Sequence, residues 1–354
     1  MKAVRLYKPG DIRTEDAPVP EIKDDEVLIK VMAVGICGSD IPRALTYGAH
    51  VSPLILGHEF SGSIEKAGKA VKGFSTGDRV TVPPLVPCEK CKWCQMGEYS
   101  LCEDYNYYGS RCDGAMAEYI AVKEKNLLRL PSQISYEDAA TSDPCANGLH
   151  AMARSGFKSG ESVVIYGAGP IGLFALQYAK KNGASKIIAV DVWPEKLNIA
   201  KSLGADVIIN AKEADVPEKV KRETGGGVNV AIDFSGVPAA QLSCIHCVSK
   251  LGRVVLLGIS HKGLELSEKE VDLIMREQLD LRGSWNSFTR PFPGSDWTGS
   301  IELMEKGVTA REIISHRLSL DEAPDIFKKI AAGGFFFNKV MFYPWGVEAA
   351  QADK

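Results

Sequence analysis

The sequence predicts an α/β protein with an additional β-rich domain, and three observations lead to this prediction. The chain of 354 residues is long enough for two domains. Residues 1–150 contain short β-branched segments separated by Gly, Pro and Asp, which is typical of a β-rich domain. From Glu161 onward strand-like and helix-like segments alternate, which is typical of a doubly wound parallel sheet.

The strands predicted in the first region are short, and the end of the chain is predicted to join them. Residues 285–297 are aromatic and rich in Pro and Gly, and helices and a last strand at 339–343 follow. Because a doubly wound unit is complete without these residues, we expect them to return to the first domain. The predicted domains are 1–151 with 287–354, and 152–286. The strands expected in the first region cover 26–34, 61–65, 79–82 and 117–122.

The second region alternates buried-strand runs with helical periodicity. Residues 162–166, Ser-Val-Val-Ile-Tyr, predict a buried strand, 171–182 a helix and 186–190 another strand. The alternation continues through 197–203, 207–209, 219–224, 228–233, 239–249 and 254–257. We therefore predict the parallel sheet of a Rossmann domain.

Composition and charge argue against several classes of protein. The chain is 45% hydrophobic and 25% charged, with a formal net charge of −3. This balance gives no general attraction to nucleic acid or to an anionic membrane. No apolar run approaches the ~20 residues that span a bilayer, and the first residues lack the apolar segment of an export signal. We expect a cytoplasmic protein.

Four cysteines form the most informative motif of the chain. Thiols three residues apart, with a fourth nearby, can close a tetrahedron around one ion. A [4Fe–4S] cluster is the competing use of such a run, but a closed set of four thiolates favours structural zinc. Disulfides are disfavoured, because the cysteines number nine and no signal peptide is recognisable. The predicted ligands of the structural zinc are Cys88, Cys91, Cys94 and Cys102.

A glycine-rich turn predicts a dinucleotide site. Residues 167–172, Gly-Ala-Gly-Pro-Ile-Gly, follow one predicted strand and open a helix, whose N-terminus favours a pyrophosphate. Asp191 ends the next predicted strand, where a carboxylate binds the ribose hydroxyls and repels a 2′-phosphate. We therefore expect NAD rather than NADP. The expected cofactor-binding residues are Gly167, Gly169, Pro170, Ile171, Gly172 and Asp191.

A second metal site is suggested by a thiol, an imidazole and a carboxylate on separate segments. Cys37 follows a predicted strand, and His58 and Glu59 come about twenty residues later. Such a mixed set can leave one position open, as catalytic zinc requires. Taken singly, each residue has a structural explanation. The second zinc motif and the dinucleotide turn on the same chain make the metal site the better interpretation.

With these motifs the chain resembles the zinc-containing medium-chain alcohol and polyol dehydrogenases over nearly its whole length. The resemblance implies a GroES-like β-rich catalytic domain, formed by both ends of the chain, and a Rossmann domain between them. It also implies NAD and two zinc ions per chain as cofactors. The pattern that carries it is Gly57-His58-Glu59-x2-Gly62-x5-Gly68-x2-Val71, followed by Gly77-Asp78-x-Val80.

The resemblance also implies roles for single residues. Cys37, His58 and a carboxylate would bind the catalytic zinc, and the carboxylate could be Glu59 or Asp143. Zinc with one thiolate and one carboxylate is neutral, so we expect one of the two carboxylates to exchange with water or substrate. Ser39 would relay the proton, and Asp40 would orient His58. Lys339 resembles a basic residue near the cofactor phosphates, and an exposed charge on a strand is the alternative.

The expected reaction is the reversible oxidation of a secondary alcohol to a ketone. Several stretches, Gly109-Ser-Arg111 among them, resemble galactitol-1-phosphate 5-dehydrogenases, which suggests a polyol or polyol phosphate. Residues 143–150 instead resemble threonine dehydrogenases, so threonine and free polyols such as sorbitol stay as alternatives. Arg43, and less so Arg111, could bind a phosphate.

Partners other than the small substrate are not expected, apart from further copies of the chain. A zinc-ribbon nucleic-acid binder is disfavoured by the acidic residues around the four cysteines. A relative that has lost catalysis would be expected to lose zinc ligands or the relay hydroxyl, and Cys37, His58, Glu59 and Ser39 are all present. The resemblance implies a homodimer or a homotetramer.

Overall fold

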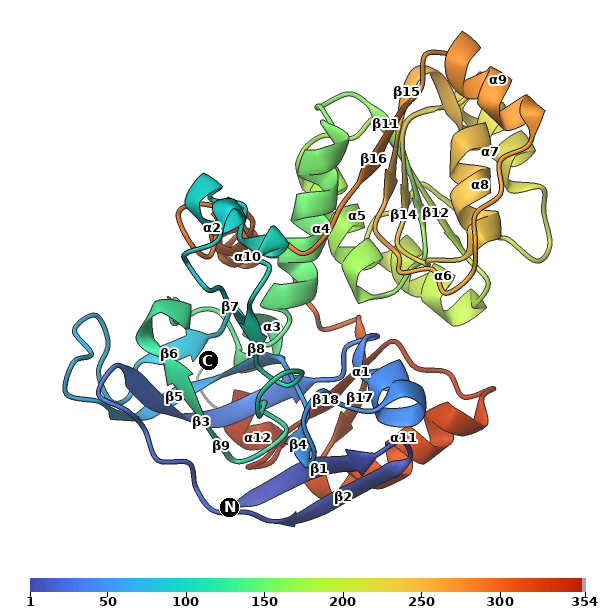
Figure 1. Ribbon diagram of the computed structural model, residues 1–354. Coiled ribbons are helices and arrows are strands. Elements are labelled where there is room, and N and C mark those ends of the chain that lie inside the picture. The colour runs from blue at the N-terminus through green and yellow to red at the C-terminus, as the bar shows by residue number, and fades with distance from the viewer. Residues whose placement is uncertain (352–354) are drawn as a thin grey trace. The chain divides into compact units, whose positions relative to one another are not determined.

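The computed structural model of the chain describes residues 1–351 and divides into two compact units (Figure 1). Unit 1 contains Met1–Asp143 and the described residues from Ser287 onward, and unit 2 is Pro144–Asn286. The predicted boundary after residue 151 falls within helix α4 (Ser142–Ser155). The predicted domain limits stay a prediction.

Unit 1 is built around β3 (Glu26–Gly35), whose sequence Glu-Val-Leu-Ile-Lys-Val-Met-Ala-Val-Gly is buried at most positions. β5 (Glu59–Ala67) pairs antiparallel with β3 along one edge. Along the other edge, β9 (Tyr119–Lys123) pairs with the first half of β3 and β18 (Lys339–Phe342) with its end. The expected return of the chain to this sheet is thus made by β18, which places C-terminal residues beside the end of β3.

The remaining elements of unit 1 are short and extend or cover this sheet. The seven-stranded sheet has the order β10-β6-β5-β3-β18-β17, with β9 beside β3, and smaller sheets have the orders β2-β1-β4 and β7-β8. The other strands are β1 (Lys2–Lys8), β2 (Asp11–Asp16), β4 (Leu54–Ile55), β6 (Arg79–Thr81), β7 (Leu85–Val86), β8 (Asn106–Tyr107), β10 (Leu128–Arg129) and β17 (Ile314–Leu318). The helices are α1 (Asp40–Pro42), α2 (Lys92–Met96), α3 (Tyr136–Ala139), α10 (Ser295–Glu305), α11 (Ala323–Ala332) and α12 (Val347–Gln351).

Unit 2 is a six-stranded sheet in which every pairing is parallel, with the order β13-β12-β11-β14-β15-β16. β11 (Ser162–Tyr166) is buried at all its positions, because helices cover both faces of the sheet. Figure 1 shows α5 on one side and α7 and α8 on the other. The other strands are β12 (Lys186–Asp191), β13 (Val207–Asn210), β14 (Val228–Asp233), β15 (Val248–Leu256) and β16 (Asp280–Gly283). The other helices are α5 (Pro170–Lys181), α6 (Pro194–Ser202), α7 (Val216–Thr224), α8 (Pro238–Cys247) and α9 (Glu268–Arg276).

The predicted fold class is confirmed, since a β-rich unit accompanies a doubly wound parallel sheet. The predicted strands 162–166 and 228–233 coincide with β11 and β14. None of the helices within residues 1–351 is both long and apolar enough to cross a lipid bilayer.

A buried carboxylate forms hydrogen bonds with three residues of the C-terminal part of unit 1. Glu137, on α3, accepts hydrogen bonds from Arg317 Nε at 2.8 Å and from the Tyr343 hydroxyl at 2.6 Å. Gln351 Nε2 donates a third bond at 3.1 Å. Burial raises the pKa of Glu137, but the bonds from Arg317 and Tyr343 outweigh burial and leave this pKa below its usual value.

We predict that Glu137→Gln lowers the free energy of unfolding by about 2 kcal/mol at neutral pH, because Arg317 loses its charged partner. The lowered pKa of Glu137 means that its contribution is complete above the unfolded-state pKa and is lost as the pH falls through the folded-state pKa. The gap between the two proteins should therefore shrink below about pH 4 in urea titrations. Exposed Glu348→Gln is the control, and an equal effect of both substitutions would contradict the assignment.

Candidate active site

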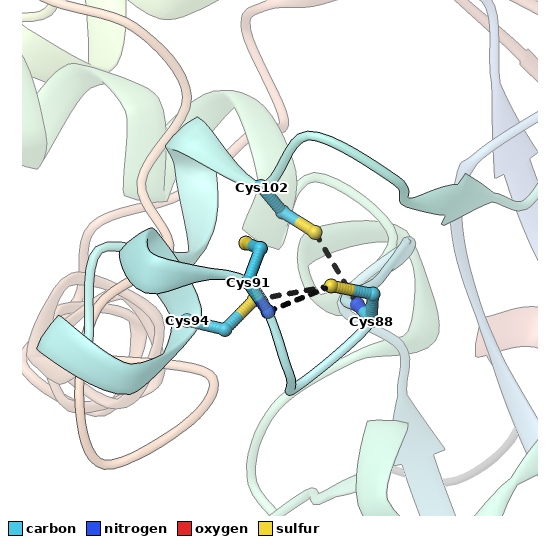
Figure 2. A group of neighbouring side chains, drawn as sticks. All are labelled: Cys88, Cys91, Cys94 and Cys102. Atoms are coloured by element: carbon cyan, nitrogen blue, oxygen red, sulfur yellow. Dashed lines mark hydrogen bonds between the residues drawn. The ribbon is translucent and has the colours of Figure 1, made fainter.

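Four thiols in unit 1 gather into one cluster, as predicted (Figure 2). The Sγ atoms of Cys88, Cys91, Cys94 and Cys102 lie within 4.8 Å of one another, and those of Cys88 and Cys94 are 4.0 Å apart. Zn–S bonds of ~2.3 Å place the sulfurs of a tetrahedral site ~3.8 Å apart, so the cluster fits zinc. All nine cysteines are free thiols, so no disulfide competes for these sulfurs.

Backbone N–H groups around the cluster favour thiolates. The amide of Cys91 donates to Cys88 Sγ at 3.4 Å, and that of Cys88 donates to Cys102 Sγ at 3.3 Å. Hydrogen bonds from backbone amides, first of all that of Cys94, lower the pKa of Cys91 to about 6. Backbone amides lower the pKa of Cys88 as well, whereas burial raises the pKa of Cys94 and that of Cys102. Thiolates are the form that binds metal, so a cation would favour the ionised form of all four thiols.

The second predicted group also assembles, because the register of two strands brings its segments together. Gly35 at the end of β3 pairs with Glu59 at the start of β5, which places Cys37 beside His58 and Glu59. Ligand atoms of these three residues lie within 4.8 Å of one another, and both His58 and Glu59 are buried. Gly57 has a φ of +95°, and a Cβ there would lie 2.8 Å from Met116, so only glycine suits the turn before His58.

Asp40 links this group to the helix that follows Cys37. Its fully buried carboxylate accepts a bond from the Cys37 amide at 3.0 Å and faces His58 Nδ1 at 3.5 Å. This is the place from which a carboxylate can orient a metal-binding imidazole. Burial lowers the pKa of His58, but Asp40 and Cys37 outweigh burial and raise it well above the usual range. A cation at this imidazole is thus strongly favoured by its neighbours.

The two arginines considered as phosphate partners have different surroundings. Arg43 Nη1 forms a largely buried ion pair with Asp40 Oδ1 at 2.8 Å, so its charge is already matched. The hypothesis that Arg43 is the anion partner is weakened by this contact. The exposed guanidinium of Arg111 instead lies 4.2 Å from the centre of the Tyr105 ring.

Lys339 is not the exposed charge on a strand that was the alternative interpretation. Its expected place near the cofactor phosphates stays a prediction. Its side chain is buried at the start of β18, where Nζ pairs with Glu59 Oε2 and donates to the Ile36 carbonyl at 2.9 Å. Burial lowers the pKa of Lys339, but Glu59 and Cys37 outweigh burial and raise it. Sequence spacing could not have found this pair, because 280 positions separate the two residues.

The remaining predicted residues lie close by but outside the three-ligand group. Asp143 is the second residue of α4 and is buried. Burial, with the charge of Glu59 adding to it, raises its pKa to about 7. Within residues 1–351, the ligand atoms of Cys37, His58 and Glu59 lie within 4.8 Å of one another, and Asp143 is not part of this group. Ser39 is half-buried, and its amide faces Cys37 Sγ at 3.5 Å.

The sequence did not reveal one aromatic residue of this site. Tyr107, on β8, packs edge-on against His58 with ring centres 5.5 Å apart. Its position depends on the pairing of a two-residue strand, β7, with β8, and such short strands leave little sequence signal.

The predicted dinucleotide turn in unit 2 lies at the end of β11, as expected. A Cβ on Gly172 would lie 2.1 Å from the Gly167 carbonyl oxygen, whereas Gly169 faces open space within 4 Å. These are the requirements of helix packing and of a pyrophosphate approaching the backbone. The Asp191 carboxylate accepts bonds from the amides of Ala168 at 2.8 Å and Val192 at 2.7 Å.

A cavity of about 480 Å³ adjoins this carboxylate. Gly167 and Asp191 line it together with Val192, Val216 and Val237, and its wall is mostly apolar. Its two acidic residues are Asp191 and Asp215. This composition fits an adenosine moiety. Lys196 belongs to no motif of the sequence. Burial lowers the pKa of Lys196, and the nearby charge of Asp191 offsets only part of this effect.

Comparison with known proteins agrees with the site. Residues 23–132 match the family described as alcohol dehydrogenase GroES-like domain, and residues 170–306 match zinc-binding dehydrogenase. Galactitol 1-phosphate 5-dehydrogenase of Escherichia coli K12 is 38% identical over 97% of this chain and 100% of its own length. Sorbitol dehydrogenase of Bacillus subtilis is 37% identical over 97% of both chains.

Solved structures give the same result. The crystal structure of galactitol-1-phosphate dehydrogenase from Escherichia coli has a TM-score of 0.91 and 36% identity, covering 97% of this chain and 100% of that one. A zinc-binding dehydrogenase from Sinorhizobium meliloti, solved with NADP, has a TM-score of 0.89 and 33% identity, covering 97% and 99%. The chain belongs to the family of zinc-dependent alcohol and polyol dehydrogenases, as its motifs predicted.

We predict that Cys94→Ser removes one of about two zinc ions per chain and lowers the melting temperature by several degrees, because three thiolates hold the lobe less firmly. Zinc analysis and thermal unfolding measure the two effects. Cys244→Ser, at a buried thiol of unit 2, should keep both ions. A Cys94 variant that keeps both ions and its stability would contradict the structural role.

We predict that Asp191→Ala raises the KM for NAD roughly 10–100-fold, because a charged acceptor for the ribose hydroxyls is lost. Steady-state kinetics with NAD and NADP measure the effect. Glu195→Gln, at a nearby exposed carboxylate, should leave both values unchanged. A wild-type protein that uses NADP better than NAD would refute this assignment.

Proposed function

We propose that this dehydrogenase oxidises a secondary alcohol of a polyol or polyol phosphate to the ketone, with NAD and a catalytic zinc. The observation that carries the proposal is the group of half-buried Cys37 with buried His58 and Glu59, which offers three different ligand types within 4.8 Å. Thiolate, imidazole and carboxylate together suit catalytic zinc with an open position, whereas four thiolates suit a closed site.

Each zinc would have its own ligands. Cys37, His58 and one carboxylate, Glu59 or Asp143, would hold the catalytic ion, and Cys88, Cys91, Cys94 and Cys102 the structural one. Zinc bound at the first site supplies a Lewis acid for the substrate hydroxyl, and NAD supplies the hydride acceptor. Asp40 keeps the His58 ring oriented.

Ser39 would carry the substrate proton away from the site. Its hydroxyl lies on the segment of Cys37 without being needed as a ligand, and the side chain is half-buried. A hydroxyl can accept one proton while donating its own, which is the requirement for a relay.

NAD is proposed over NADP because Asp191 would repel a 2′-phosphate. The dinucleotide would lie along Gly167, Gly169, Pro170, Ile171 and Gly172, with its adenosine in the cavity beside Asp191. Lys196 could offset part of the repulsion of a phosphate, so a measured preference tests this choice.

Polyol phosphates are placed first among the substrates, because one curated relative is named for galactitol 1-phosphate. Sorbitol and threonine are the alternatives. A panel of galactitol 1-phosphate, sorbitol and threonine with NAD separates them. A higher kcat/KM for a free polyol or threonine would refute the phosphate preference, and no activity with any alcohol would refute the proposed reaction.

The cell compartment and assembly are proposals from the sequence. Nine free thiols suit the reducing cytoplasm. We propose a homodimer or a homotetramer, with neither nucleic acid nor membrane as partner. Light scattering of the purified protein measures the assembly.

We predict that Ser39→Ala keeps zinc and NAD binding but lowers kcat roughly 10²–10⁴-fold, because the proton loses its acceptor. Single-turnover reduction of NAD, together with zinc analysis, measures both effects. Ser75→Ala, at an exposed serine of the same unit, should behave like the wild type. Near-normal turnover of the Ser39 variant would show that the proton takes another route.

A further inference from the structure

Tyr107 is fixed next to His58 by backbone contacts on both sides. The Tyr107 carbonyl accepts bonds from the amides of Ser110 and Arg111, which closes the turn after it. The segment that follows pairs with the one before His58: the Gly114 amide donates to the Ile55 carbonyl and the Ala115 amide to Gly57, each at 2.8 Å. Backbone hydrogen bonds therefore join the turn after Tyr107 to the segment before His58.

The phenol ring of Tyr107 lies against the candidate metal-binding group. Its centre lies 5.5 Å from that of the His58 ring in an edge-on arrangement. The acidic groups that act on its hydroxyl are Asp143, Cys37, Glu59 and Asp40, all of them in or beside the candidate zinc site. Tyr107 is thus a neighbour of the place where an alcohol would be oxidised.

The hydroxyl of Tyr107 has no partner within the part of the chain that the structure describes. The side chain is half-buried, yet only the Tyr107 amide, and not the phenol oxygen, has a side-chain partner, Asn106. A phenol O–H can donate one hydrogen bond and accept others, and it is uncharged at neutral pH. The Tyr107 hydroxyl is therefore available as a donor.

We propose that the Tyr107 hydroxyl donates a hydrogen bond to a substrate hydroxyl on a carbon next to the one oxidised, and so selects polyhydroxy alcohols over simple secondary alcohols. When a polyol enters this site, each of its hydroxyls loses hydrogen bonds to water and needs a hydrogen-bond partner on the protein instead. Tyr107 supplies such a partner. A simple secondary alcohol has no neighbouring hydroxyl and gains nothing from it. This inference rests on the proposed function.

The test compares Tyr107→Phe with the wild type on galactitol 1-phosphate, sorbitol and 2-butanol. Phenylalanine keeps the ring against His58 and removes only the hydroxyl. We expect kcat/KM to fall about tenfold for the two polyols, the effect of one neutral hydrogen bond, and to change less than about twofold for 2-butanol. Zinc content should equal that of the wild type.

Tyr108→Phe is the matched control, because the Tyr108 hydroxyl faces away and accepts a bond from the Lys123 amide at 3.1 Å. It should leave the ratio of polyol to 2-butanol activity unchanged. An equal loss on all alcohols, no loss on any, or a loss of zinc in Tyr107→Phe would overturn the inference alone. A wild-type protein that reduces NAD with none of the three would overturn the proposed function together with it.

Discussion

The matching of buried charges is the constraint on which the site in unit 1 depends. Glu59 and Asp40 are both buried, and a buried carboxylate without a partner is costly. Each has a cation of its own: Lys339 from β18 for Glu59, and Arg43 from the segment after Cys37 for Asp40. The return of the C-terminal strand to β3 is therefore part of the site's chemistry, since it delivers one of these cations.

The ion pair between Glu59 and Lys339 affects the net charge of the candidate zinc site. From the sequence, two carboxylates near zinc and Cys37 would leave the site anionic, and one of them was expected to exchange with water or substrate. The ion pair with Lys339 offsets the charge of Glu59. Zinc with the Cys37 thiolate and one further carboxylate would then be neutral overall. Burial raises the pKa of Asp143 to about 7, and a zinc cation beside it would favour the ionised form again.

Local patterns predicted the parts of the molecule that depend on neighbours in sequence. The strand and turn at Gly167 and the four-cysteine loop could be read from spacing, because each needs only a short motif and its flanks. The Cys37, His58 and Glu59 group lies on two segments and was inferred only with the support of these two motifs. The edge strand β16 was missed, because its residues 280–283 are few and include Asp and Arg. The helix α9 was missed as well. Tyr107 and the burial of Lys339 depend on pairings between distant segments, which one sequence does not reveal.

The most direct test is the location of the metal ions by anomalous X-ray scattering at the zinc absorption edge. The account predicts two peaks per chain, one inside the four thiols of the cysteine lobe and one within bonding distance of Cys37 Sγ and His58 Nε2. The second peak should be lost in crystals of a Cys37→Ser variant, while the first remains. A single peak at the lobe, or a second peak away from Cys37 and His58, would contradict the central claim that the buried group of unit 1 is a zinc site.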